Sequence, residues 1–324
     1  MTPVPLVSIG IPTYNRIGTL KRAIDSVLQQ DYPNIELIVS DNASSDGSAE
    51  LCAAYARAVP HMVFIRQPTN RGAGLNFLEV LTNAHGKYFM WLGDDDWLDP
   101  SYISECVQVF ERRPDCSLVC GQARYFFGDT DLGFGVTVNL LQESPIRRVL
   151  TYYTLVRDNG TFYGLMRREE IAPILMPIYV GLANDWLLLA ALAFRGKIVT
   201  VTGTCVHRLL GSPGGMSCRP EETTQVALAR QALEHGLSAS DADNPGRAIA
   251  KIVFRNIISS SVYAQLSAVT RWYMALRAAL TVYKTWSLYD KYSPMSFLLV
   301  KFRPRHRMRG AVQKMEGVLK RIVE

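Results

Sequence analysis

The chain has 324 residues, of which 48% are hydrophobic, so it is long enough for one large α/β domain and an extension. Its formal net charge is +6, and residues 291–324 alone carry nine Lys or Arg against two Glu. The positive excess therefore lies in the C-terminal tail, which argues against a nucleic-acid surface spread over the body. The longest apolar run, residues 186–194, is too short to span a bilayer, and no basic and apolar leader follows Met1, so we expect a cytoplasmic protein.

Strand and helix patterns alternate along the first 115 residues. Each of four apolar, β-rich runs is followed by helical periodicity, and these runs are 6–12, 35–40, 62–65 and 87–92. This alternation predicts right-handed βαβ units, and hence an α/β fold with a mainly parallel sheet flanked by helices. Each strand ends in a polar or glycine-bearing loop, at 12–16, 40–48, 68–74 and 93–97. Because these loops share one edge of a parallel sheet, that edge is the expected binding crevice.

The second half of the chain has less regular patterns. They predict a strand at 116–127, a helix within 143–157, a strand entering a helix at 161–171, a buried helix from Asn184 and a strand at 197–209. The glycine-rich run 211–217 predicts a flexible loop. From Glu221 the composition is helical. We therefore expect a catalytic domain over residues 1–220 and a helical C-terminal region over residues 221–324.

The C-terminal tail is basic and amphipathic. Apolar residues recur at helical spacing over 311–323, and a basic residue stands at every second position over 301–309. Two interpretations stay open. Residues 291–324 contact a membrane surface, or they form a helix that packs back on the body beside a solvated basic loop.

Three adjacent carboxylates, Asp94, Asp95 and Asp96, directly follow the strand predicted at 87–92. Such a triplet concentrates negative charge, which is costly unless water, a helix N-terminus or a divalent cation offsets it. One interpretation is a ligand or metal site beyond the end of the strand. The other is a solvated turn that caps the helix beginning near Asp99 and Pro100.

Five segments together resemble the nucleotide-sugar-binding domain of family 2 glycosyltransferases, which have the GT-A fold. They occur in the family's order, at 7–16, 28–48, 70–77, 86–97 and 183–189. The resemblance covers roughly residues 5–210. It implies an inverting enzyme that transfers a sugar from a UDP- or dTDP-sugar to a hydroxyl of a glycan or lipid-linked acceptor. Together with the basic, amphipathic tail, the resemblance leads us to expect a role in bacterial surface polysaccharide synthesis.

The resemblance implies a nucleotide site built from strand-end residues. Thr13 and Tyr14, after Pro12, would hold a pyrimidine base by hydrogen bonding and stacking. Asp41 would accept a hydrogen bond from the imide of the base, and Arg71 would lie near the base or diphosphate. The other expected contacts with the nucleotide sugar are Arg16, Asn42, Asp94, Asp95 and Arg208. Taken alone, Thr13, Asp41 and Asn42 are more typical of turn or helix caps, and Arg71 of a surface cation.

The acidic triplet resembles the family's DXD element. Asp94 or Asp95 would then face the ribose. Asp96 would hold Mn²⁺ or Mg²⁺, which bridges the two phosphates of the donor and neutralises the leaving diphosphate. Relatives often have Asp, a small residue, Asp and Asp here, whereas this chain has Gly93 before three aspartates. The roles of the individual aspartates therefore stay open.

Two further segments resemble catalytic elements of the family. Asp185 matches the second carboxylate of an acidic pair, which is the general base toward the acceptor, and Asn184 replaces the first. The alternative is that one of them caps the following helix. His207 and Arg208 match a segment near the phosphates, which implies a diphosphate clamp for Arg208 and metal ligation for His207. A later histidine of that segment is leucine here, so both roles stay open.

Two other functions compete with glycosyl transfer. A nucleotidyltransferase would also use a metal and a parallel sheet, but its first loop is expected to be richer in glycine than residues 12–18. A catalytically silent nucleotide-sugar-binding protein would keep Asp41 and the triplet but lack the base. Asp185 therefore distinguishes an enzyme from a silent binding protein.

Overall fold

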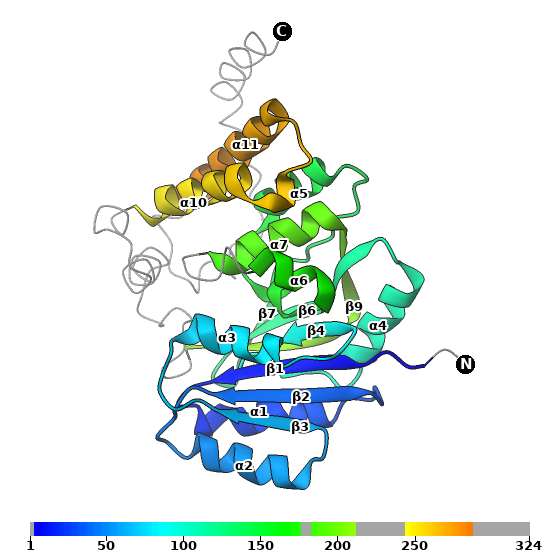
Figure 1. Ribbon diagram of the computed structural model, residues 1–324, viewed down its shortest axis with the longest axis vertical. Helices are drawn as coiled ribbons and strands as arrows, with labels where there is room; N and C mark the ends of the chain where they lie inside the picture. The colour runs from blue at the N-terminus through cyan, green and yellow to red at the C-terminus, as the bar shows by residue number, and fades with distance from the viewer. Residues whose placement is uncertain (1–2, 176–182, 212–243, 288–324) are drawn as a thin grey trace.

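A computed structural model describes residues 3–175, 183–211 and 244–287 (Figure 1). One nine-stranded sheet organises these residues, in the order β3, β2, β1, β4, β8, β6, β9, β5, with β7 paired to β6. Its strands are β1 (Val7–Thr13), β2 (Ile35–Asp41), β3 (Met62–Arg66), β4 (Tyr88–Trp91), β5 (Trp97–Leu98), β6 (Cys116–Phe127), β7 (Thr130–Phe134), β8 (Leu165–Arg167) and β9 (Lys197–Leu210).

The N-terminal half of the sheet is parallel, as predicted. β1 pairs with β2 and β4, and β2 pairs with β3, all in parallel. Every residue of β1 is buried, since helices cover both faces of this strand. Thr13 is in register with Asp41, and the Asn42 amide donates to the Thr13 carbonyl at 2.9 Å. The carboxyl ends of β1 and β2 therefore meet at one edge of the sheet.

The other half of the sheet is mixed. β8 is antiparallel to β4 and β6, whereas β6 and β9 run parallel. The prediction of a mainly parallel sheet with flanking helices is confirmed, but the periodicity missed β5 and β7. β5 has two residues, too few to show a period, and β7 contains Asp131 and Gly133, which are rare in strands. β5 pairs with β9 directly after the acidic triplet, so it fixes the course of that loop.

Helices cover both faces of the sheet. They are α1 (Ile17–Leu28), α2 (Ser48–Ala58), α3 (Ala73–Thr82), α4 (Tyr102–Arg112), α5 (Pro145–Leu155), α6 (Arg168–Leu175) and α7 (Asn184–Arg195), with the short 3₁₀ helix η1 (Gly160–Tyr163). The predicted buried helix is confirmed in α7, where all residues from Trp186 to Phe194 are buried. Trp91 at the end of β4 stacks on Phe162 of η1 with ring centroids 5.1 Å apart, which joins the two halves of the core.

Two C-terminal helices form an outer layer over α5 and α7 (Figure 1). They are α10 (Pro245–Ser259) and α11 (Ala268–Ser287), separated by the 3₁₀ turn η2 (Ser261–Tyr263). Phe194 of α7 contacts Tyr263 of η2, with ring centroids 5.0 Å apart. Within the described residues, no helix is both long and apolar enough to cross a membrane. The predicted domain boundary at residue 221, most of the predicted loop 211–217 and the tail 291–324 lie outside the described residues.

Candidate active site

The acidic triplet lies in the loop between β4 and β5, at the carboxyl edge of the parallel strands. The Leu92 amide donates to the Gly10 carbonyl at 2.9 Å, so the β1 pairing delivers the chain to this point. Gly93 then lets the loop fold back on itself. A Cβ atom at Gly93 would lie 2.6 Å from Asp96 Oδ2 and 3.1 Å from Asp95 Oδ1, closer than such atoms pack. Glycine at this position therefore permits the three carboxylates to gather.

Asp96 is buried and forms an ion pair with Arg208 of β9. Arg208 Nε lies 2.6 Å from Asp96 Oδ2, and the Leu209 amide donates to Asp96 Oδ1 at 3.1 Å. Burial raises the pKa of Asp96 to about 7, with Arg208 opposing the rise and Asp95 adding to it. The Arg208 guanidinium also lies over the Tyr163 ring, 4.1 Å from its centroid. Arg208 is thus fixed on both sides next to the triplet.

Arg16 faces the other two carboxylates. Its Nε lies 3.5 Å from Asp94 Oδ1 and its Nη2 lies 3.7 Å from Asp95 Oδ2. Burial and the neighbouring Asp95 raise the pKa of Asp94 to about 7, while Arg16 lowers it. Arg16 and Arg208, the two arginines that the sequence predicted near the donor, therefore both pair with carboxylates of the triplet. The structure brings all five side chains together.

The predicted nucleotide-contacting residues of β1 and β2 lie at the same edge. Asp41 is fully buried and accepts from the Ser44 amide at 3.1 Å, so it also closes a local turn. Asn76 of α3 donates to the carbonyls of Thr13 and Ser40, at 3.2 and 3.0 Å. Tyr14 is 44% exposed, as a stacking surface requires, and its amide donates to Asp94 Oδ2 at 3.4 Å. Pro12 lies within buried β1.

Asn42 and Arg71 are linked by the loop that follows β3. Asn42 Oδ1 accepts from the Arg71 amide at 2.9 Å. The Arg71 guanidinium contacts Gln67 Oε1 and Glu79 Oε2, both at 3.3 Å. These contacts hold the loop beside Asp41, while the side chain of Arg71 is bound to its own loop and to α3.

Asp185 stands at the start of α7 and connects to Arg208 through one further residue. The Trp186 amide donates to Asp185 Oδ1 at 2.9 Å, and the Asn159 side chain forms a second hydrogen bond to the carboxylate. Arg208 Nη1 donates to Asn159 Oδ1 at 3.0 Å. Desolvation raises the pKa of Asp185, while these hydrogen bonds and the charge of Arg208 lower it. A polar chain therefore runs from Asp185 through Asn159 and Arg208 to Asp96.

His207 interacts with Asp99 and Trp97. His207 Nε2 lies 2.7 Å from Asp99 Oδ1, and Trp97 stacks on the imidazole with ring centroids 5.0 Å apart. Asp99 Oδ2 accepts from the Cys205 amide at 2.8 Å, so the side chain of Asp99 ties β9 to the loop instead of capping α4. His207 Nδ1, the nitrogen that remains for a ligand, is buried and has no hydrogen-bond partner among the described residues.

Sequence reasoning missed three residues around the site. Asn159 connects the proposed base to Arg208. Arg22 of α1 lies over Trp97, 3.7 Å from the ring centroid, and donates to the Asp95 carbonyl at 3.3 Å. Asn76 joins the ends of β1 and β2. The Asn159–Gly160 pair is a turn signal that could have drawn attention to the first, whereas Arg22 sits in an ordinary helical pattern.

The triplet suits a cation that is shared with a ligand. Within the described ranges, no group of three His, Cys, Asp or Glu side chains could hold a metal ion. Mg²⁺ in enzymes of nucleotide chemistry is usually bound by one or two carboxylates and completed by substrate phosphates and water. Asp94 and Asp96, whose pKa values are raised to about 7 mainly by desolvation, would be stabilised as anions by such a cation.

Comparison with known proteins identifies the sequence family. A profile of Glycosyl transferase family 2 matches residues 8–171. An uncharacterised glycosyltransferase of Rickettsia typhi is 34% identical over 119 residues, 36% of either chain. The glycosyltransferase GlyA of Streptococcus pneumoniae is 30% identical over 167 residues, 51% of this chain and 22% of GlyA. The chain thus matches well under two thirds of the length of either relative.

Solved structures share the architecture. TarS 1-349 of S. aureus in complex with UDP-GlcNAc has a TM-score of 0.51 at 16% identity, over 86% of this chain and 81% of that one. Mannosyltransferase PcManGT from Pyrobaculum calidifontis, in complex with GDP-Man and Mn²⁺, has a TM-score of 0.51 at 16% identity, over 92% and 86%. At these identities the likeness concerns the fold. Since the family profile matches half of the chain, the chain belongs to glycosyl transferase family 2.

Proposed function

We propose that the protein is an inverting glycosyltransferase that moves a sugar from a UDP-sugar, or a dTDP-sugar, to a hydroxyl of a glycan or lipid-linked acceptor. The observation that carries the proposal is the polar chain from Asp185 to Asp96. This chain connects Asp185, which could act as a general base, with Asp96, which could bind a cation held by the diphosphate. Family membership and the nucleotide sugars bound by TarS and PcManGT support the same conclusion.

The donor nucleotide would lie against the ends of β1 and β2. Asp41, Thr13 and Tyr14 would contact the base, and Asn42 and Arg71 would hold the adjoining loop. Arg16, Asp94 and Asp95 would face the ribose and the phosphates. The half-exposed ring of Tyr14 supports this placement, because a stacking surface has to be open to its ligand.

Asp96 would hold Mn²⁺ or Mg²⁺, and His207 Nδ1 is the further candidate ligand. A bound cation supplies neutralisation of the charge that develops on the departing diphosphate. Arg208 already compensates Asp96 in this structure. Its guanidinium would therefore divide its hydrogen bonds between Asp96 and the donor phosphates, which bidentate arginine geometry allows.

Asp185 would act as the general base. Its carboxylate takes the proton of the acceptor hydroxyl while the hydroxyl oxygen attacks the anomeric carbon, and the bond to the diphosphate oxygen breaks on the opposite side. One displacement of this kind inverts the configuration. The desolvation that raises the pKa of Asp185 makes it a stronger base, and the Asn159 hydrogen bond keeps it ionised and oriented.

A thermal-unfolding screen of nucleotide sugars with and without Mn²⁺ tests donor binding. A donor at a hundredfold excess over its Kd adds about 2.7 kcal/mol to the free energy of unfolding. We expect UDP-sugars to stabilise the protein more in the presence of Mn²⁺ than in its absence. Stabilisation by no nucleotide sugar, with or without the metal, would contradict the proposal.

The acceptor and pathway follow from the family resemblance and the composition of the tail. We infer that the acceptor belongs to bacterial surface polysaccharide synthesis and that residues 291–324 contact the inner face of a membrane, where lipid-linked acceptors are displayed. Flotation of the protein with and without residues 291–324 tests the tail. Equal flotation of both forms would remove that part of the proposal.

A further inference from the structure

The layer formed by α10 and α11 contains no acidic residue. Residues 244–287 include six Lys or Arg and no Asp or Glu, although the whole chain carries 29 acidic residues. Arg271 forms hydrogen bonds within the layer: its guanidinium donates to the carbonyls of Ile258, Ser260 and Tyr263 at 2.8, 3.0 and 3.1 Å. That arginine ties the end of α10 to the start of α11. Arg247 and Arg255 of α10 are exposed, so the layer presents positive charge at its surface.

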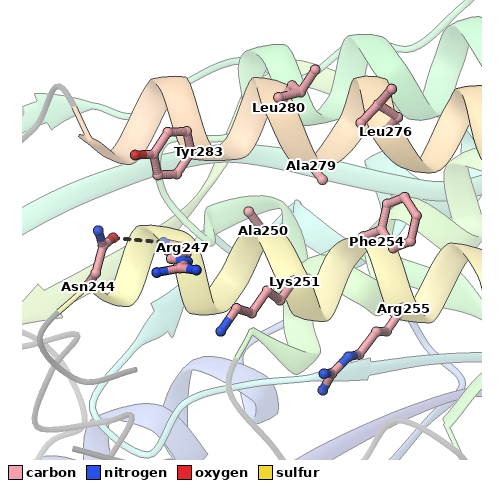
Figure 2. Close-up of a pocket in the computed structure, with 10 residues that line it drawn as sticks. All are labelled: Asn244, Arg247, Ala250, Lys251, Phe254, Arg255, Leu276, Ala279, Leu280 and Tyr283. Atoms are coloured by element: carbon pink, nitrogen blue, oxygen red, sulfur yellow. Dashed lines mark hydrogen bonds between the residues drawn. The ribbon is translucent and has the colours of Figure 1, made fainter. Parts of the chain in front are cut away.

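A groove of about 460 Å³ follows the two helices. From α10 it is lined by Arg247, Lys251 and Arg255, which recur every four residues, together with Ala250 and Phe254. Figure 2 shows Ala250 and Phe254 directed toward α11, whereas Lys251 and Arg255 extend from the other side of α10. The groove thus has an apolar centre and a basic border on one side, and none of the described residues that line it is acidic.

The opposite wall, α11, is apolar on two faces. Its inner face buries Met274, Ala275, Ala278 and Val282. Its outer face carries Val269, Trp272, Tyr273, Leu276, Leu280 and Tyr283, at the spacing of one helical stripe. Val269, Trp272, Tyr273 and Tyr283 are 69%, 50%, 42% and 41% exposed. Exposed aromatic and aliphatic side chains in one stripe mark a binding surface, since solvent disfavours them.

We propose that the α10–α11 surface docks on a lipid bilayer that contains anionic lipids. Arg247 and Arg255 of α10 would contact lipid phosphates, and the outer stripe of α11 would enter the interfacial region, where tryptophan and tyrosine are favoured. A nucleic-acid backbone would match the cations but would leave the aliphatic side chains of α11 without a partner. The proposed surface is formed by residues 244–287, and its binding requires no sugar transfer.

Flotation of the full chain with phosphatidylcholine vesicles, with or without phosphatidylglycerol, tests the proposal. We expect the wild type to float with the anionic vesicles and to be released by salt. Arg247→Glu/Arg255→Glu is expected to lower the bound fraction at least about tenfold, because each cation near an anionic surface contributes to partitioning. Trp272→Ser is expected to weaken binding several-fold through the apolar contact.

A matched control separates the surface from net charge. Arg57→Glu/Arg112→Glu changes the net charge equally, but these arginines are exposed on α2 and α4, so it should float as the wild type does. Thermal unfolding and UDP binding of each variant show that the fold is intact. Unchanged flotation of Arg247→Glu/Arg255→Glu would overturn the proposal and would leave residues 291–324 as the membrane-binding segment. The proposal would also be overturned if the control variant lost as much vesicle binding as Arg247→Glu/Arg255→Glu, or if the protein bound RNA but not vesicles. Since no donor is present, these outcomes are independent of transferase activity.

Discussion

Arg208 Nε lies 2.6 Å from Asp96 Oδ2, and the same guanidinium donates through Nη1 to Asn159, whose side chain also hydrogen-bonds to Asp185. One buried cation therefore compensates the acidic triplet and reaches toward the proposed base. Breaking a buried ion pair by removing one partner leaves an uncompensated charge, which costs more than removing both partners.

Arg208→Met should lower the free energy of unfolding at pH 8 by about 3–5 kcal/mol, because Asp96 is then buried as an unpaired anion. Because Arg208 lowers the pKa of Asp96, its removal raises that pKa above the wild-type value of about 7, so the loss should shrink as the pH falls toward about 7 and Asp96 of the variant becomes protonated. Urea unfolding at pH 8 and pH 5 measures both effects. Arg208→Met/Asp96→Asn should be more stable at pH 8 than Arg208→Met alone. Equal free energies of unfolding for the two variants would show that Asp96 does not destabilise the fold when Arg208 is absent.

Asp94 should make stability depend on pH in the opposite sense to an ordinary surface carboxylate. Its pKa is raised to about 7 in the folded protein, whereas an unfolded aspartate titrates near 3.9, so the folded state holds the proton longer. Asp94 therefore contributes a loss of stability as the pH rises from about 4 to about 7. Asp94→Asn removes this loss. Relative to the wild type, the variant should gain stability between pH 5 and pH 8 in urea unfolding, and a difference independent of pH would refute the shift.

Asn159→Ala should lower kcat and move the acidic limb of the pH profile of kcat to higher pH. The Asn159 hydrogen bond lowers the pKa of Asp185, so its loss lets that pKa rise. The other groups that interact electrostatically with Asp185, namely Arg208, Tyr152 and Tyr163, remain in place.

Asp158→Ala is the matched control for Asn159. Asp158 holds the same loop by accepting from the amides of Gly160 and Val136, at 3.0 and 2.9 Å, but it lies outside the polar chain. It should lower thermal stability without moving the limb of the pH profile. If both variants leave the limb in place, Asn159 is a structural loop residue and the chain has no catalytic consequence.

Gly93→Ala should weaken donor binding and lower the free energy of unfolding by about 1–3 kcal/mol, because the added Cβ would lie 2.6 Å from Asp96 Oδ2. Calorimetric titration with UDP and Mn²⁺ measures the first effect, and urea unfolding the second. Gly203→Ala in β9 is the control, since a Cβ there meets no atom within 4 Å. Equal affinity of Gly93→Ala and the wild type for UDP would contradict the prediction, because it would show that moving the side chain of Asp96 does not affect donor binding.

The parallel half of the fold was predictable because its signals are local. Each strand from β1 to β4 is a short apolar run bounded by turn residues, and a helix follows each of these runs, as the periodicity predicted. β5 could not be predicted, because its two residues pair with β9 more than a hundred positions away. Its existence depends on tertiary contacts such as that between Asp99 and the Cys205 amide.

The candidate site likewise has one part that could be predicted from the sequence and one part that could not. Residues at the ends of β1, β2 and β4 follow from strand boundaries, so their convergence at one edge could be predicted from topology. The partners of the charges could not be predicted. Nothing in the sequence pairs Arg208 with Asp96, Arg16 with Asp94, or Asn159 with Asp185, because the side chains come from separate elements. The roles of Asp96 and His207 toward a metal stay predictions.

The most direct test of the account is the rate of sugar transfer by Asp185→Asn, measured beside its affinity for UDP in the presence of Mn²⁺. Asparagine keeps the shape of the side chain but accepts no proton. We predict that UDP affinity is unchanged, because Asp185 belongs to the acceptor side, and that kcat falls by about 10²–10⁴-fold. Unchanged turnover in a variant that still binds UDP would contradict the assignment of Asp185 as the base and, with it, the proposed mechanism.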